Sequence, residues 1–279
     1  MKNLGWYNGK YDLLENMMIP MNDRVCYFGD GVYDALISRN YVPYYLDEHI
    51  DRFFRSAELT DMEVPLSKTE LAVLIRDLMR KVDSDVQFIY FQLTRGTGDR
   101  LHAYEKGKGN LWITLRPSAY NLCEKTIQVI TRPDKRFEYC HVKTLNLLPS
   151  VLYAEEAKKA GCYETILYRE GGRVTECAHS NCHIMKDGAL ITAPLDEWIL
   201  PGIQRAHLIM AAKRLGMPVE ERPYDLTELF NADEILVTDS ANFALRVDTV
   251  DGKPAGMKDP ALYEKLRKEV VDEFLDYTK

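Results

Sequence analysis

The sequence lacks the features that mark several large classes of protein. No run approaches about 18 consecutive apolar residues, which argues against a membrane-spanning helix. The first ten residues, MKNLGWYNGK, lack the apolar stretch of a secretory signal peptide, so we expect a cytoplasmic protein. Lys and Arg total 36 against 43 Asp and Glu, and the net charge of -7 without a basic cluster argues against nucleic acid or an anionic membrane as the main partner. We therefore expect a small-molecule substrate.

Internal repeats, low-complexity tracts and a regular cysteine spacing are also absent. The six cysteines are scattered, which favours free thiols in a chain without an export signal. One cluster, Cys177-Ala-His179-Ser-Asn-Cys182-His183, contains four side chains of types that bind zinc, but its spacing matches neither a C-x2-C pair nor a zinc-binding loop. We predict no metal site, and a non-catalytic metal-binding protein remains a remote alternative.

The length of 279 residues favours two domains over one simple core. Between Pro117 and Glu124 the strand pattern stops and polar residues enter, which is typical of a linker. We predict a smaller N-terminal α/β domain at residues 1–118 and a larger domain at residues 119–279. Strands and helices do not alternate in regular βαβ units, so the predicted class is α+β with mixed sheets.

The elements of the first domain are predicted from periodicity and turn residues. Asn8-Gly9 predicts a hairpin turn within Trp6–Leu13, and Ser67 is a suitable N-cap for a helix at 68–81. Further predicted elements are a strand at Tyr41–Leu46, a helix at His49–Leu59, and strands at Val86–Thr94 and Asn110–Leu115. The polar loop from Arg95 to Gly109 is too long to be a simple hairpin turn.

The second domain has a denser strand pattern. A β segment begins at Thr126, and a helix from Pro149 to Ala160 is closed by Gly161. The remaining predictions are strands at 163–168, 173–178, 181–185, 189–192 and 234–238, helices at 201–215, 226–230 and 260–277, and a hairpin turning at Asp251-Gly252.

Lys143 stands alone in the apolar segment Val142-Lys-Thr-Leu145, which resembles a buried strand running into a helix. A lysine in such a segment commonly extends its ammonium group to water. A desolvated lysine has a lowered pKa instead, and its amine attacks carbonyl groups, as a Schiff-base lysine must. The local sequence leaves both interpretations open, and the choice depends on whether the chain also supplies residues for a carbonyl cofactor.

Pyridoxal phosphate is such a cofactor, and it requires a phosphate anchor and an acid beside its pyridine nitrogen. Leu200-Pro-Gly-Ile-Gln-Arg205 opens a predicted helix, whose first N–H groups and dipole favour an anion. Arg52 and the segment Thr238-Asp-Ser240 offer further phosphate contacts, and Glu176 is a candidate pyridine partner. Taken singly, each residue also has an ordinary structural explanation.

Together these motifs resemble the class IV aminotransferases, which are fold-type IV pyridoxal phosphate enzymes. The resemblance rests on Lys143-Thr-Leu-Asn-Leu-Leu, on Thr175-Glu176 followed by Asn181, on Leu190-x-Thr192, and on Leu200-Pro-Gly-Ile-Gln-Arg205. It is closest to the D-amino acid (D-alanine) aminotransferase subgroup and extends over nearly the whole chain, through the segments Asp23–Tyr33, Glu48–Arg52, Tyr90–Thr97 and Gly161–Leu167. It implies a two-domain fold with the cofactor at the domain interface.

The resemblance also implies roles for individual residues. Lys143 would form the Schiff base and carry a proton between the substrate and the cofactor, and Glu176 would bind the pyridine nitrogen. The phosphate would be held by Arg52, by the backbone at Ile203 and Gln204, and by Ser240. The substrate carboxylate would be held by Tyr33, Arg100 and His102. In this family the loop with the last two residues reaches the active site of the partner subunit, which implies a homodimer.

The implied activity is a ping-pong transfer of the amino group of D-alanine, D-glutamate or D-aspartate to 2-oxoglutarate or pyruvate. An L-branched-chain aminotransferase and an aminodeoxychorismate lyase of the same fold remain alternatives, although Arg100-Leu-His102 favours the D-specific enzyme. Gln204 replaces a phosphate-binding threonine that is frequent in relatives, so we expect this contact to come from the backbone alone. Cys177-Ala-His179 replaces small Gly or Ser residues, and we expect His179 to share a strand face with Glu176 and adjust its charge.

Overall fold

The computed structural model describes residues 1–107 and 109–279; Lys108, within the predicted loop from Arg95 to Gly109, lies outside the described residues. The chain divides into two compact units. Unit 1 contains Met1–Tyr120, Val142–Asn146 and Leu275–Lys279, and unit 2 contains Asn121–His141 and Leu147–Phe274. The domain predicted at 119–279 thus differs from unit 2, because the short segment with Lys143 and the last five residues belong to unit 1.

Unit 1 contains a six-stranded sheet in the order β2-β1-β6-β5-β3-β4. Its strands are β1 (Leu4–Tyr7), β2 (Lys10–Asp12), β3 (Gly31–Arg39), β4 (Val42–Pro43), β5 (Gln87–Thr94) and β6 (Asn110–Pro117), and all pair antiparallel. The predicted hairpin is confirmed: Asn8 and Gly9 have positive φ angles of 44° and 94°, as a tight turn between β1 and β2 requires.

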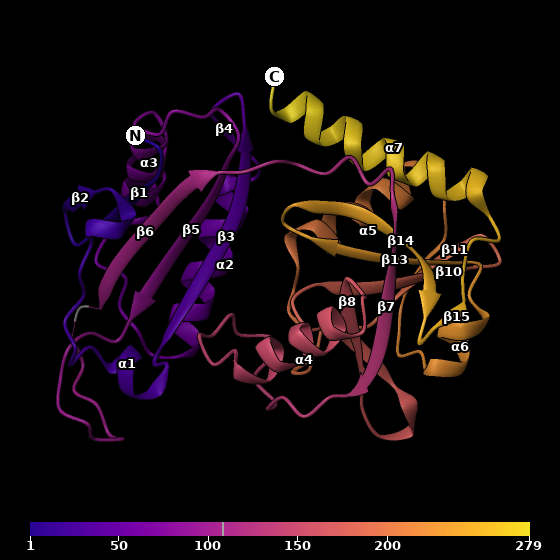
Figure 1. Cartoon of the computed structure of the whole chain (residues 1–279), viewed down its shortest axis with the longest axis horizontal. Helices are drawn as coiled ribbons and strands as arrows, with labels where there is room; N and C mark the ends of the chain where they lie inside the picture. The colour runs from indigo at the N-terminus through magenta and orange to yellow at the C-terminus, as the bar shows by residue number, and fades with distance from the viewer. Residues whose placement is uncertain (108) are drawn as a thin grey trace. The chain divides into compact units, whose positions relative to one another are not determined.

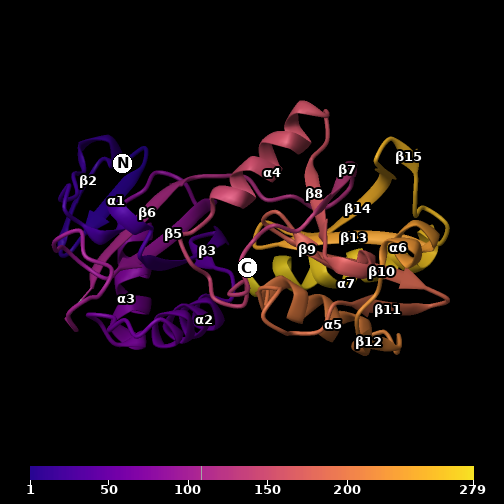
Figure 2. The ribbon, with the colours of Figure 1, turned by 90° about the horizontal axis from the view of Figure 1, so that it is seen from below.

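Two helices pack against this sheet. Figure 2 shows α2 (Leu46–Leu59) and α3 (Lys68–Met79) side by side on one face of it, with α1 (Arg24–Phe28) away from them. A short helix, η1, spans Leu14–Asn16. The predicted N-cap of α3 is confirmed, because the Ser67 hydroxyl accepts from the Glu70 N–H and the Glu70 carboxylate accepts from the Ser67 N–H. Phe53 of α2 and Phe91 of β5 are fully buried in the core between the layers.

Unit 2 contains a nine-stranded sheet, and its mixture of parallel and antiparallel pairs agrees with the predicted mixed-sheet class. The strands are β7 (Thr126–Pro133), β8 (Glu164–Tyr168), β9 (Val174–Cys177), β10 (Asn181–Lys186), β11 (Ala189–Thr192), β12 (Val219–Glu221), β13 (Glu234–Asp239), β14 (Asn242–Val250) and β15 (Lys253–Pro254). Strand β7 pairs parallel with both β8 and β14, whereas β10 pairs antiparallel with β11 and β13 (Figure 1).

Four helices of the second half of the chain begin and end close to the predicted residues. They are α4 (Leu148–Lys159), α5 (Ile203–Arg214), α6 (Leu226–Asn231) and α7 (Pro260–Tyr277). The short helix η2 (Glu170–Gly172) was not predicted. Helix α5 starts two residues later than predicted because Gly202 is its N-cap, with an extended backbone. Figure 2 shows α5 on the side of the sheet away from α4.

Some predictions were wrong. Strand β3, helix α1 and strand β12 were not predicted at all. Instead of a strand, the segment Val142–Leu145 forms a single bridge between Thr144 and Val32. The strand predicted at Tyr41–Leu46 shrinks to β4, since α2 already begins at Leu46.

All six cysteines are free thiols, as predicted. No helix among the described residues combines the length and the apolar character needed to cross a membrane.

Candidate active site

Lys143 is fixed by its backbone to two elements of unit 1. Its carbonyl accepts from the N–H of Tyr33 on β3 (3.0 Å), and its N–H donates to the hydroxyl of Ser56 on α2 (3.2 Å). The side chain is half-buried, and its Nζ lies 4.5 Å from the centre of the Tyr33 ring. Within residues 1–107 and 109–279 no carboxylate forms an ion pair with Nζ. The amine is therefore held in place without a neutralising anion.

Arg52, a predicted phosphate ligand, belongs to a buried ion cluster of unit 1. Its Nε and Nη2 donate to the two oxygens of Asp34 on β3 at 2.8 Å each. Nδ1 of His49, one helical turn before Arg52, lies 2.7 Å from Asp34 Oδ1. Burial alone would raise the pKa of the Asp34 carboxyl, but Arg52 and His49 outweigh it, and the pKa lies well below its ordinary value. Burial lowers the pKa of His49; the Asp34 carboxylate opposes this, and the charges of Arg52 and Lys143 add to it. The two hydrogen bonds to Asp34 thus fix the orientation of the Arg52 guanidinium.

Arg100 and His102 are both exposed, and both meet Phe28 of α1. The Arg100 guanidinium lies 5.4 Å from the centre of the Phe28 ring, and the rings of His102 and Phe28 are 5.2 Å apart. Arg24, also on α1, donates to the carbonyls of Leu101 (2.6 Å) and His102 (3.3 Å). No contact among the described residues joins either loop side chain to Tyr33. Within one chain, the three predicted carboxylate ligands are therefore not brought together.

Glu176, on β9 of unit 2, is nearly completely buried and strongly hydrogen-bonded. Its Oε1 accepts from Arg136 Nη1 at 2.6 Å, and its Oε2 accepts from Asn181 Nδ2 and from the Leu200 N–H, both at 3.0 Å. Burial raises the pKa of this carboxyl, while Arg136 and the Leu200 N–H oppose the rise. Sequence reasoning did not find Arg136, which lies 40 residues away in the chain.

The N-terminus of α5 lies close to the groups that hold Glu176. Asn181 donates to both Glu176 and the Leu200 carbonyl, and its Oδ1 would be only 2.0 Å from a Cβ at position 202, so Gly202 is required there. No side chain in the described ranges caps the helix. Gln204 is 4% exposed, yet its Nε2 has no hydrogen-bond partner among the described residues. Unpaired first-turn N–H groups and a buried amide donor form a site suited to an anion.

Ser240, the last predicted phosphate ligand, lies in the turn between β13 and β14. The Asp239 carboxylate accepts from the N–H groups of Ala241 and Asn242 and thereby fixes this turn. The preceding hydroxyl, of Thr238, is engaged elsewhere, 2.9 Å from His183 Nε2.

The Cys and His residues that follow Glu176, considered above as possible zinc ligands, have other roles in the structure. His183 is fully buried between the hydroxyls of Thr192 and Thr238, and burial lowers its pKa to about 3. Cys177 and Cys182 are buried. Among the described residues, no group of three or more His, Cys, Asp and Glu side chains is arranged to hold a metal ion.

The structure gives His179 a different partner from the one expected. Its Nδ1 lies 2.9 Å from Oε2 of the buried Glu164, which also accepts from the Ser180 hydroxyl. Burial alone would lower the pKa of His179, but Glu164 outweighs it and the pKa is raised. The charged partner of Glu176 is Arg136 instead, because β9 ends at Cys177 and His179 lies in the turn after it.

Comparison with known proteins identifies the family to which the chain belongs. The family model for amino-transferase class IV matches residues 31–250. A D-alanine aminotransferase from Listeria monocytogenes serotype 4b is 35% identical over 94% of this chain and 92% of its own length. A D-alanine aminotransferase from Bacillus licheniformis is 31% identical over 91% of this chain and 90% of its own length.

Solved structures show the same fold. The branched-chain amino acid aminotransferase of Escherichia coli superimposes with a TM-score of 0.90 at 24% identity, over 100% of this chain and 97% of that chain. A branched-chain aminotransferase from Thermoproteus uzoniensis gives a TM-score of 0.88 at 22% identity, over 98% of this chain and 97% of that chain. The family match over most of the chain and the full-length relatives together make this chain a member of the class IV aminotransferases, with the fold-type IV architecture.

Proposed function

We propose that this chain is a pyridoxal phosphate-dependent transaminase that moves the amino group of D-amino acids, such as D-alanine, D-glutamate and D-aspartate, to 2-oxoglutarate or pyruvate. The observation that carries the proposal is the full-length likeness to D-alanine aminotransferases together with Lys143, Glu176 and the Arg100-Leu-His102 loop. The likeness to branched-chain aminotransferases concerns the fold, since the identities are below 25%.

The residues of unit 2 fit the cofactor's phosphate and ring nitrogen. A phosphate at the uncapped start of α5 would accept from the N–H groups of Ile203 and Gln204, and the Gln204 amide offers one further donor. Ser240 adds a hydroxyl from the neighbouring turn. Glu176 keeps one acceptor position, because three donors occupy a carboxylate that accepts about four hydrogen bonds. That position suits a protonated ring nitrogen.

The residues of unit 1 fit two further needs of the reaction, an amine that reacts with the cofactor and a positive charge for its phosphate. Bound pyridoxal phosphate would supply an electron-accepting ring for the carbanion at the substrate Cα. No carboxylate in the described part of the chain pairs with the Nζ of Lys143, which would act as nucleophile and as the base that moves the Cα proton. Arg52, fixed by Asp34, would supply a directed positive charge for the phosphate.

The substrate carboxylate would bind to Tyr33, Arg100 and His102, the last two supplied by a partner subunit. Exposure of the loop and its anchoring on Phe28 rather than on Tyr33 support this division. It is tested by mixing two inactive variants, Arg100→Ala and Lys143→Ala, under conditions that exchange subunits. Activity that neither variant has alone supports a shared site in a homodimer, whereas no recovery despite exchange contradicts it.

The cofactor assignment is tested by binding and reduction. The protein is incubated with pyridoxal phosphate, separated from the free compound, treated with borohydride and digested. A visible absorbance band lost on reduction, and a phosphopyridoxyl mass on the peptide containing Lys143, are expected. A stable label confined to other lysines would contradict the proposal.

A further inference from the structure

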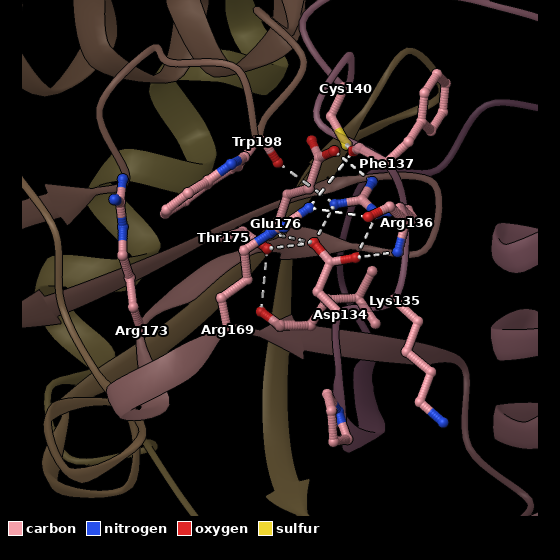
Figure 3. Close-up of polar contacts among 12 residues, drawn as sticks. Asp134, Lys135, Arg136, Phe137, Cys140, Arg169, Arg173, Thr175, Glu176 and Trp198 are labelled. Atoms are coloured by element: carbon pink, nitrogen blue, oxygen red, sulfur yellow. Dashed lines mark hydrogen bonds and ion pairs between the residues drawn. The ribbon is translucent and has the colours of Figure 1, made fainter.

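Arg136 is shared between two buried carboxylates of unit 2. Its Nε and Nη2 donate to the two oxygens of Asp134 at 3.0 Å each, and its third nitrogen, Nη1, donates to Glu176 at 2.6 Å. Figure 3 shows the guanidinium between the two acids. Side-chain exposure is 0% for Asp134, 9% for Arg136 and 7% for Glu176, so water screens these interactions little.

Asp134 is itself held from several directions. It also accepts from the Arg136 backbone N–H (3.0 Å) and from the Thr175 hydroxyl (3.3 Å), and Arg169 Nε lies 3.4 Å from it. Its own N–H donates to the Tyr168 carbonyl at 2.7 Å. A carboxylate this constrained fixes the plane of the guanidinium, and with it the direction of Nη1.

We propose that Asp134 is a positioning residue that acts through Arg136 to keep the Glu176 carboxylate ionised and aimed at a protonated pyridine nitrogen. The inference rests on the proposed function, and it deepens it by naming what sets the charge of the ring's partner. The proton shared by Glu176 and the ring nitrogen stays on nitrogen only while the carboxylate is the weaker base.

The charges facing Glu176 show why Arg136 is required. Burial raises the pKa of Glu176, Arg136 and the Leu200 N–H lower it, and Asp134 raises it further. The thiol of Cys140, whose pKa burial raises to about 11, is neutral at physiological pH. Without Arg136, a buried Glu176 would take the proton and leave the ring nitrogen neutral.

The two possible roles of Asp134 predict opposite effects of replacing it by Asn. If Asp134 acted only through its charge, its replacement by Asn would favour an ionised Glu176. If it positions Arg136, the same replacement removes the fork, turns Nη1 away and favours a protonated Glu176. The sign of the change therefore separates the two roles.

The experiment uses holoenzyme loaded with pyridoxal phosphate carrying ¹⁵N in the ring, and it reads the ring nitrogen's protonation from its ¹⁵N chemical shift. Arg136→Gln is expected to lower the ratio of protonated to neutral nitrogen about tenfold or more, which corresponds to one pKa unit of Glu176. Asp134→Asn should change the ratio in the same direction, and Arg136→Lys should restore part of it. Arg173→Gln is the matched control, because Arg173 packs on the same Trp198 ring as Arg169 but pairs with Asp196.

The inference would be overturned if the ratio of protonated to neutral ring nitrogen in Arg136→Gln equalled that in Arg173→Gln. A ratio in Asp134→Asn above that of the wild-type protein would also overturn it. If Arg136→Gln does not fold, Arg136→Lys decides: an unchanged ratio there also overturns it. Failure of the cofactor assignment looks different, since the wild-type protein would then bind no pyridoxal phosphate and give no ring-nitrogen signal; a preference for L-amino acids would overturn the substrate assignment and leave this inference standing.

Discussion

The Nζ of Lys143 lies 4.5 Å from the centre of the Tyr33 ring, and the Tyr33 N–H donates to the Lys143 carbonyl at 3.0 Å. These two residues are 110 positions apart in the chain, yet β3 fixes both the backbone of Lys143 and the aromatic face beneath its amine. An aromatic ring attracts the cation without taking its proton. The ring therefore orients the Lys143 side chain without accepting a proton from it.

Lys143→Ala should lower the rate of amino transfer about 10³-fold or more, because both the nucleophile and the base are lost. The measurement is the initial rate with D-alanine and 2-oxoglutarate. Lys159→Ala, which removes an exposed lysine paired with Glu155, is the control and should leave the rate unchanged. A substantial rate in Lys143→Ala would rule out its catalytic role.

Asp34→Asn should destabilise the protein by about 3–5 kcal/mol at neutral pH, because it removes the negative charge that accepts from both Nε and Nη2 of the buried Arg52. The pKa of Asp34 lies well below its ordinary value, so its stabilising effect is present at neutral pH and disappears only as the pH falls through that low value. Urea unfolding measures the loss. The matched control, Asp51→Asn, breaks an exposed pair with Lys68 and should cost less than about 1 kcal/mol; equal effects would contradict the account.

His183 should make the protein sensitive to acid. Its pKa of about 3 in the folded protein lies below the unfolded value, so the unfolded state binds the proton first and stability falls as the pH drops from about 6.5. Between pH 6.5 and 4.5 the loss should be on the order of 2–3 kcal/mol. In His183→Gln this part of the pH dependence should vanish from urea unfolding, whereas His102→Gln, at an exposed position, should retain it. An unchanged profile in His183→Gln would refute the assignment.

Gln204→Ala should weaken pyridoxal phosphate binding about tenfold, the expected loss for one charge-assisted hydrogen bond. The reason is the buried Nε2, which has no partner among the described residues and lies on the first turn of α5. Equilibrium dialysis gives the dissociation constant, and Gln128→Ala, at an exposed position of β7, serves as the control. Equal constants for both variants would mean that the backbone alone holds the phosphate at this position.

Arg24→Gln should raise the KM for D-alanine several-fold with a smaller change in kcat. Arg24 donates to the carbonyls of Leu101 and His102, so its loss frees the loop that carries the proposed carboxylate ligands. Steady-state kinetics separate the two constants. The control is Lys106→Gln: Lys106 lies on the same loop, and its replacement removes an exposed ion pair with Asp61. If both variants behave alike, Arg24 does not position the loop.

Local signals predicted much of the fold. The Asn8-Gly9 turn and the Ser67 capping box depend on residues that are close in the chain, and both are confirmed. Strand β3 was missed because it is buried on nearly all positions, including Asp34 and Ser38, and thus shows no alternation of apolar and polar residues. The α5 start was placed two residues early, since Pro201 and Gly202 resemble a first turn in sequence.

The candidate site was predictable only where a motif marked a residue. Lys143, Glu176 and the segment Leu200–Arg205 belong to such motifs, whereas Arg24 and Arg136 acquire their roles through partners 77 and 40 residues away. No local pattern distinguishes these two arginines from surface arginines. The pairing of His179 with Glu164 was missed because we expected His179 to share a strand face with Glu176; the two are three positions apart, which in a strand puts them on opposite faces, and His179 lies beyond the end of β9.

The central claim is that the enzyme acts on D-amino acids, and the initial rates with D-alanine and with L-leucine as donors to 2-oxoglutarate test it most directly. We expect D-alanine to be the better donor by about 10²-fold or more in kcat/KM, because the carboxylate ligands determine which face of the Cα meets the base. The glutamate formed should be the D-enantiomer by chiral chromatography. A preference for L-leucine, with L-glutamate as the product, would contradict the account.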